Sequence, residues 1–309
     1  MSTSTALSSM ASALPGKPGA GNSSDEAVNE SVNEGVNESV DRLSQFLQRH
    51  PDVLLLTGAG ISTASGIPDY RDADGVRRGN APVQGPDFRR QEAVRRRYWA
   101  RSMVGYPTLS RAAPNPGHLA IAQLASQQRI GSLVTQNVDG LHQRAGSTDV
   151  TELHGSIHGV VCLDCQRTYA RSAIQQQLEH DNPQMAGLVA TPAPDGDALL
   201  EPSQLASFQL PQCLHCGGTL KPDVVFFGDG VPSACSAEAL RKMEQASALL
   251  VIGSSVMVYS SFRLCRLASE TGKPVAAVNI GKTRADALLA FKLEVPAQDV
   301  LPAVAAILA

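Results

Sequence analysis

Two stretches of the chain combine side chains that could bind a polar ligand and move protons. Residues 66–71, GIPDYR, place a carboxylate, an aromatic ring and a guanidinium beside a rigid turn. Residues 135–142, TQNVDGLH, carry Asn137 and Asp139, which project to the same side of an extended backbone and offer an amide and a carboxylate. His154 follows these stretches, and its imidazole suits general acid–base catalysis.

Four of the six cysteines form two CxxC pairs, Cys162 with Cys165 and Cys213 with Cys216. Each pair can present two thiolates to one ion from a tight turn, and four thiolates complete the closed shell of a structural zinc. We therefore expect one structural Zn²⁺, which leaves His154 for acid–base work. Two CxxC pairs in a chain of this length also indicate a reducing compartment. Cys235 and Cys265 fall at helical positions and are expected to be core thiols.

The scaffold that would hold these groups is predicted to be a parallel sheet. Residues 53–56 form a short apolar run typical of a buried strand, and a glycine turn and a short helix over 61–65 follow it. Such a turn is either a dinucleotide site, where the N–H groups at the start of the helix face a pyrophosphate, or a structural turn only, because the spacing GAGIS differs from GxGxxG. Further strands are predicted at residues 130–136, 150–153, 221–229, 248–252 and 275–279, and most end in small or polar residues.

Helices are expected between these strands. Asn115 and Pro116 are a typical N-cap and first residue of a helix, in which His118 is expected to be buried. The predicted fold class is α/β: a Rossmann-like parallel sheet with helices on both faces, plus a small zinc-binding module.

The expected domain organisation follows from shifts in composition. Residues 1–40 have almost no large apolar side chain and are expected to be a disordered tail. Residues 41–155 and 222–309 are assigned to the sheet domain, and residues 156–221 to the zinc module. Within the first part, residues 72–113 contain nine arginines between Arg77 and Arg111. This segment is either a solvated basic helix that covers the sheet, or a lid that presents positive charge to a phosphate or an acidic substrate group.

Charge and hydropathy exclude some classes of partner. The 309 residues carry a formal net charge of −3, which gives no overall attraction to nucleic acid or anionic lipid. The apolar runs are too short to span a bilayer, so we expect a soluble protein with neither a membrane nor a specific nucleic acid as partner. The tail contains no arginine before Arg42, unlike a mitochondrial presequence, which favours a bacterial-type cytoplasm over a mitochondrion.

Taken together, the motifs resemble those of the sirtuins, a family of NAD-dependent protein deacylases. The resemblance extends from residue 43 to residue 309. It rests on GAGIS at 58–62, GIPDYR at 66–71, TQNVDGLH at 135–142, HG at 154–155, the two CxxC pairs, KPDVVFFGD at 221–229, GSS at 253–255 and NIG at 279–281. Within the family, RRRYWAR at 95–101, APDGD at 193–197, the long segment between the CxxC pairs and VMVYSSFR at 256–263 resemble the class II branch. That branch includes a mitochondrial member described as an ADP-ribosyltransferase and lipoamidase.

The resemblance implies a reaction between NAD, as co-substrate, and an acyl-lysine protein or peptide. The acyl oxygen would attack the ribose anomeric carbon and release nicotinamide, and the products would be free lysine, nicotinamide and 2'-O-acyl-ADP-ribose. His154 would be the general base, Asn137 would orient the ribose and a water, and Asp139 would hold the nicotinamide carboxamide together with Ile67. The peptide would add as a strand between residues 225–228 and 256–259.

The resemblance also implies a set of cofactor-binding residues. Tyr70 stands where sirtuins usually have phenylalanine, and its added hydroxyl could alter nicotinamide exchange. Ala297 stands where many sirtuins have a cysteine near the adenine, and we expect a backbone amide to bind the adenine instead. The set comprises Thr57, Gly58, Ala59, Gly60, Ser62, Gly66, Ile67, Pro68, Asp69, Tyr70, Arg71, Gln136, Asn137, Asp139, Gly253, Ser254, Ser255, Asn279, Ile280, Gly281 and Ala297.

Two other functions remain as alternatives. The same site could act as a protein ADP-ribosyltransferase or as a lipoamidase. A non-catalytic sensor of NAD and zinc is the least favoured, because Asn137, Asp139 and His154 are all present.

Overall fold

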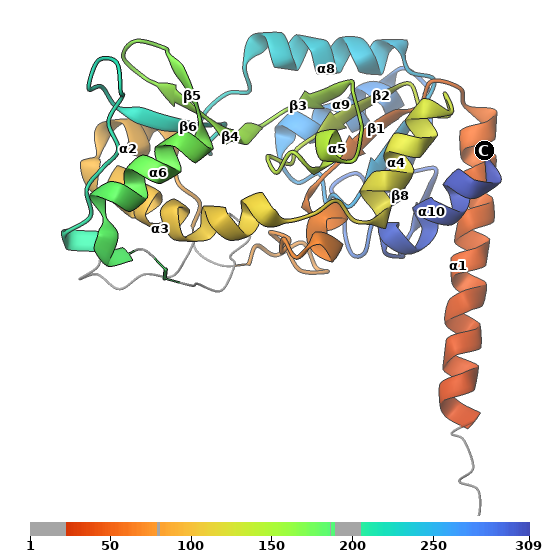
Figure 1. Cartoon of the computed structure of the whole chain (residues 1–309). Coiled ribbons are helices and arrows are strands. Elements are labelled where there is room, and N and C mark those ends of the chain that lie inside the picture. Colours follow the sequence, from red (N-terminus) through yellow and green to blue (C-terminus); the bar gives the residue numbers. More distant parts are fainter. Residues whose placement is uncertain (1–22, 79–80, 186, 189–204) are drawn as a thin grey trace, which may run out of the picture. The chain divides into compact units, whose positions relative to one another are not determined.

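The computed structural model describes residues 23–78, 81–185, 187–188 and 205–309 (Figure 1). The chain separates into two compact units, Met1–Gly35 and Val36–Ala309, and the second contains every site discussed below. Among the described residues, no helix has both the length and the hydropathy that a membrane crossing requires.

A six-stranded sheet forms the centre of the second unit, in the order β3-β2-β1-β7-β8-β9. Each neighbouring pair is parallel, which confirms the predicted α/β class. The predicted strands at 53–56, 130–136, 150–153, 248–252 and 275–279 are all present in it. The strands are β1 (Leu54–Thr57), β2 (Ser132–Thr135), β3 (Val150–Glu152), β7 (Leu249–Ile252), β8 (Val275–Val278) and β9 (Phe291–Leu293).

Helices cover both faces of this sheet, as predicted. Alternate residues of each strand point to opposite faces, so Leu55 of β1 joins the core under three helices while Leu56 joins the core under two others. The first face is covered by the part of α1 (Ser23–Arg49) from Val36 onward, by α4 (Pro116–Ser126) and by α10 (Ala297–Ile307). The second face is covered by α8 (Ser233–Gln245) and α9 (Tyr259–Glu270).

Helix α1 is longer than the sequence indicated. A disordered tail was expected through residue 40, but the helix begins at Ser23, so that expectation is wrong for residues 23–40; residues 1–22 lie outside the described part. The spacing of Val36, Val40 and Leu43 explains the difference where side chains are described. Steps of three and four place them on one helical face, and all three pack against the core of the sheet.

A second, antiparallel sheet holds the cysteine pairs. It consists of β5 (Thr168–Ala170), β4 (Gly155–Cys162) and β6 (Leu220–Val224), in that order. The KPDVVFFGD stretch was expected to return to the parallel sheet. That expectation is wrong, because Lys221 and Pro222 pair with Val161 and Val160 of β4 instead. A short run of apolar residues does not show which sheet it joins.

The arginine-rich segment packs with this second sheet and not over the parallel one. Helices α2 (Gly85–Arg90) and α3 (Glu92–Arg111) contribute Phe88 and Trp99 to a core that also contains Val160 of β4, Ile174 of α6 (Arg171–Asp181) and Leu220 of β6. The indole N–H of Trp99 donates to the Leu220 carbonyl at 3.2 Å. We therefore propose that the zinc module comprises Gly85–Arg111 and residues 222–224 in addition to the predicted residues 156–221, and that 41–84, 112–155 and 225–309 form the sheet domain. The APDGD stretch at 193–197 lies outside the described residues.

The remaining short elements connect these layers. They are the 3₁₀ turns η1 (Ala59–Ser65), η2 (Pro183–Met185) and η3 (Asp286–Leu288), and the single-turn helix α5 (Leu141–Arg144). Helix α4 begins as predicted, since the Asn115 side chain accepts from the Gly117 and His118 amides.

Candidate active site

A cavity of about 600 Å³ lies at the carboxyl ends of the four central strands. The turns after β1, β2, β7 and β8 all line it, through residues such as Gly60, Asn137, Ser254 and Asn279. Ligands of open α/β sheets bind at this end of the strands, because the loops there diverge and expose backbone groups. The cavity is therefore the candidate binding site.

The glycine turn after β1 is built to contact another turn. A Cβ on Gly60 would lie 2.9 Å from Gly253 Cα, and a Cβ on Gly253 would lie 2.3 Å from the Ile61 nitrogen. The Gly60 amide donates to the Gly253 carbonyl at 2.8 Å. This amide is thus engaged within the protein. The turns after β1 and β7 pack with their backbones in direct contact. Only glycine fits at positions 60 and 253, because a Cβ there would overlap the facing backbone.

Asn137 and Asp139 converge on Ser62. The Ser62 hydroxyl donates to Asp139 Oδ2 at 2.7 Å and accepts from Asn137 Nδ2 at 3.1 Å. Asn137 Nδ2 also donates to the Gly58 carbonyl, and the Leu141 amide donates to Asp139 Oδ1. Both side chains are more than nine-tenths buried and still line the cavity. They are therefore held in fixed orientations by the turn after β1.

Two buried histidines lie behind this cluster. The Thr57 hydroxyl donates to Thr135, so its oxygen accepts from His142 Nε2 at 2.9 Å. The rings of His118 and His142 are 4.9 Å apart, and burial lowers the pKa of both. For His142 the pKa falls to about 3, because burial and the neighbouring His118 both oppose a positive charge. His118 is buried, as predicted, and neither histidine lines the cavity.

His154 lies between β3 and β4 and lines the cavity. Its Nδ1 is 3.0 Å from the Gln136 carbonyl and its Nε2 is 3.0 Å from the Ser260 hydroxyl. A carbonyl oxygen can only accept, so Nδ1 carries the proton and Nε2 presents a lone pair. Burial lowers the pKa of His154, and the Gln136 carbonyl offsets part of that effect. The imidazole is thus neutral near pH 7, the state in which it can accept a proton.

Most of the residues that the sequence predicted as a site line this one cavity. These are Gly58, Ala59, Gly60, Ser62, Ile67, Asp69, Tyr70, Arg71, Gln136, Asn137, Asp139, His154, Gly253, Ser254, Ser255, Asn279 and Ile280. Thr57, Gly66, Pro68, Gly281 and Ala297 are not among its lining residues. Ala297 is the first residue of α10 and belongs to the core of the sheet domain.

Residues outside the predicted set complete the walls. Helix α3 contributes Tyr98 and Leu109, and α9 contributes Ser260 and Arg263. No polar spacing in the sequence marks them, although Ser260 and Arg263 fall within the VMVYSSFR stretch. Of the nine arginines in the basic segment, only Arg77 lines the cavity.

Several other arginines of this segment, none of which lines the cavity, bond to groups of the protein itself. Arg89 pairs with Asp229 at 2.7 Å, and Arg95 donates to the Phe88 and Arg89 carbonyls. Arg96 pairs with Glu92 and donates to the Ala206 carbonyl. The described contacts therefore favour the interpretation of α3 as a basic surface helix over that of a charged lid.

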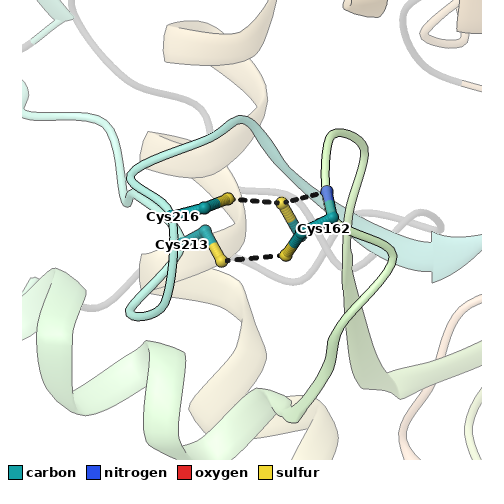
Figure 2. Close-up of side chains that lie close together, drawn as sticks. Cys162, Cys213 and Cys216 are labelled. Carbon is teal, nitrogen blue, oxygen red and sulfur yellow. Dashed lines mark hydrogen bonds between the residues drawn. The ribbon is translucent and has the colours of Figure 1, made fainter.

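The four CxxC cysteines form a single cluster. Figure 2 shows Cys213 and Cys216 on one turn and Cys162 on the facing turn, with their sulfurs directed toward a common centre. The Cys162–Cys216 and Cys165–Cys213 sulfur distances are 3.6 and 3.7 Å, and all four sulfurs lie within 4.8 Å of one another. Zn–S bonds of about 2.3 Å in a tetrahedron separate the sulfurs by roughly 3.8 Å. The cluster therefore fits one structural zinc ion, as the sequence predicted.

The other two cysteines belong to the sheet domain. Cys265 is fully buried in α9, and the Cys235 thiol donates to the Glu152 carbonyl. Burial raises the pKa of both thiols, to about 12 for Cys265. They are core thiols, as expected.

The amino-acid sequence of this chain matches a family model and several named proteins. The model of the Sir2 family matches residues 58–260. NAD-dependent protein deacetylase 3 of Pseudomonas syringae pv. tomato is 56% identical over 250 residues, which cover 81% of this chain and 89% of the relative. An NAD-dependent protein deacetylase of Bordetella bronchiseptica is 48% identical over 259 residues, which cover 84% and 94%.

Solved structures give the same result for the fold. A structure described as "Structural Basis for the Mechanism and Regulation of Sir2 Enzymes" matches with a TM-score of 0.70 and 30% identity, over 88% of this chain and 98% of that one. A structure described as "Sir2-p53 peptide-NAD+" matches with a TM-score of 0.67 and 28% identity, over 84% and 94%.

Proposed function

The chain belongs to the Sir2 family, and we propose that it is an NAD-dependent protein-lysine deacylase that forms nicotinamide and 2'-O-acyl-ADP-ribose. One observation carries the proposal: the His154 imidazole, the Asn137 amide and the Asp139 carboxylate line the same cavity at the strand ends. Related proteins are named as NAD-dependent deacetylases, and one of the matching structures is described with a peptide and NAD.

Each polar group has a role in this reaction. NAD supplies an electrophilic ribose carbon and a nicotinamide leaving group. His154 is the proposed general base, because its Nε2 lone pair is directed to the cavity while Nδ1–H is bound to the Gln136 carbonyl. Asn137 is proposed to orient the ribose and a water. Asp139, fixed by Ser62, is proposed to hold the carboxamide with Ile67, which also lines the cavity.

The peptide is proposed to bind as an added strand. Residues 224–228 and 257–259 both line the cavity, and backbone groups there can pair with an extended substrate. The exposed side chains of Phe227 and Tyr259 lie in these two segments. Main-chain pairing gives affinity with little demand on the substrate sequence.

The acyl group is proposed to be neutral. Near the zinc module the cavity is lined by Pro82, Val83, Tyr98, Leu109 and Ile157, whereas the arginines of α3 do not line it. An acidic acyl chain would thus gain no partner from α3.

Zinc is proposed to act only in folding, because four thiolates leave no open coordination position.

We also propose the branch of the family to which the chain belongs and its cellular compartment. RRRYWAR and VMVYSSFR support a place in the class II branch, whose ADP-ribosyltransferase and lipoamidase activities are the second candidate functions at this site. The relatives named above are bacterial, and the six cysteines are all unpaired, which supports a reducing bacterial cytoplasm.

The test is mass spectrometry of reactions between NAD and a panel of peptides carrying acetyl, longer neutral, succinyl, glutaryl or lipoyl groups on lysine. The native protein should form O-acyl-ADP-ribose with the neutral groups, and His154→Ala should form none. Arg97→Ala, an exposed change on α3, is the matched control and should keep the native ranking. NAD that binds without being consumed would contradict the proposal, and faster turnover of succinyl or glutaryl peptides would contradict the neutral acyl group.

A further inference from the structure

The side chain of Ser260 contacts the proposed general base directly. Its hydroxyl lies 3.0 Å from His154 Nε2, the nitrogen that faces the cavity. Because Nδ1 holds the proton, Nε2 can only accept, so the Ser260 hydroxyl donates to it. Ser260 therefore binds the lone pair that general-base catalysis would use.

The position of Ser260 is itself fixed. It is the second residue of α9, and its carbonyl accepts from Arg263 Nε at 3.2 Å. The same guanidinium donates through Nη2 to the Ser236 hydroxyl at 2.6 Å, which ties the first turn of α9 to α8. Helix α9, whose inner side chains pack in the core on the second face of the sheet, thus holds the Ser260 hydroxyl against the His154 imidazole.

The two neighbours of His154 are also linked to each other. Gln136 orients Nδ1 through its carbonyl, and its side-chain amide donates to the Ser254 hydroxyl at 2.7 Å. Ser254 Oγ in turn accepts from the Val256 amide, in the turn that leads into α9. Val256 has a φ of 45° although it is β-branched and fully buried, a conformation that persists only where its surroundings enforce it. These hydrogen bonds form a closed ring that runs through Gln136, His154 and Ser260 and returns along the turn before α9.

We propose that Ser260 is a positioning residue for His154: it holds the imidazole in the Nδ1–H tautomer with Nε2 directed into the cavity until a substrate hydroxyl replaces it. This inference rests on the proposed deacylase function. Ser260 acts in this proposal only through its hydrogen bond and takes no covalent part in the reaction. When a ribose hydroxyl donates to Nε2, the serine hydroxyl withdraws, because the nitrogen has a single lone pair.

The test begins with nitrogen NMR of ¹⁵N-histidine protein without substrate, in which His154→Ala assigns the resonance. In the native protein, His154 should show one tautomer with Nδ1 protonated and Nε2 accepting a hydrogen bond. In Ser260→Ala, the Nε2 resonance should shift and broaden, since exchanging water replaces a fixed donor. Ser260→Thr, which keeps the hydroxyl, should restore the native signal.

Kinetics supply the second measurement. Loss of one positioning hydrogen bond should lower kcat by about threefold to tenfold, with KM for NAD changed by less than about twofold. Ser261→Ala is the matched control: its neighbouring hydroxyl donates to the Val258 carbonyl and does not contact His154. Ser261→Ala should leave both the His154 spectrum and kcat native.

The outcomes separate the two proposals. An unchanged His154 spectrum in Ser260→Ala, or an equal change in Ser261→Ala, would overturn the role of Ser260. A native protein that consumes no NAD would overturn the deacylase function, while the spectra of the free protein would still decide whether Ser260 holds His154.

Discussion

The hydroxyl of Ser62 donates to Asp139 Oδ2 at 2.7 Å, which links the turn after β1 to the turn after β2. The same oxygen accepts from Asn137, so one hydroxyl orients two polar side chains of the proposed NAD site. The Ser62 side chain is fully buried.

Ser62→Ala is therefore expected to lower both stability and NAD affinity. It would leave a buried carboxylate oxygen without its donor, which typically costs about 1–3 kcal/mol. Urea unfolding and NAD binding by calorimetry measure the two effects. Thr63→Ala is the control, because the Thr63 hydroxyl is exposed and bonds only within its own turn. Equal effects of the two substitutions would contradict the role of Ser62.

Gly253→Ala is expected to be strongly destabilising. Gly253 has a φ of 59°, and its Cβ would lie 2.3 Å from the Ile61 nitrogen, so the turns after β1 and β7 would have to separate. Gly272→Ala separates the two effects: its φ is 70° but nothing lies within 4 Å of the added Cβ, so it should lose only about 1–2 kcal/mol from conformation. Thermal unfolding that gives equal losses for both would show that the turns can move apart freely.

His142 is expected to make the protein less stable in acid. Above about pH 6.5 the imidazole is neutral in both the folded and the unfolded chain. As pH falls from there toward 3, the unfolded chain takes up a proton that folded His142, with a pKa of about 3, does not. Stability should thus decrease by up to about 1.4 kcal/mol per pH unit from this group, and the decrease should end near pH 3.

The measurement compares urea unfolding of the native protein and His142→Gln at several pH values between 7 and 4. The variant cannot take up this proton, so the difference in stability between the two proteins should narrow as pH falls. A constant difference would mean that His142 is not buried as a neutral group.

Removal of zinc is expected to loosen the small module and to abolish activity indirectly. Trp99, the only tryptophan, is buried in one core with Cys162 and Cys213, so its fluorescence reports on this module. A strong chelator, or Cys213→Ser, should shift the emission of Trp99 to longer wavelength because water reaches the indole. Cys235→Ser, in the sheet domain, should keep the zinc and the native emission. Full activity after complete loss of zinc would contradict the assignment.

Much of the fold followed from local sequence patterns. Short apolar runs gave five strands of the parallel sheet, and the CxxC spacing gave the cysteine cluster, because both features depend on residues that are close together in the chain. The motifs also predicted that His154, Asn137 and Asp139 lie together, and all three line one cavity, since side chains at the ends of parallel strands meet at one edge.

Contacts between distant residues were decided only by the tertiary structure. Lys221 pairs with β4 and not with the parallel sheet, and Trp99 packs with Leu220, 121 residues away. Ser260 is 106 residues from His154, and no periodicity relates the two. The sequence determined which groups could do chemistry and on which elements they lie. Which groups touch depends on how the sheets and helices pack, because that energy comes from contacts across the whole core and leaves little trace in any one segment.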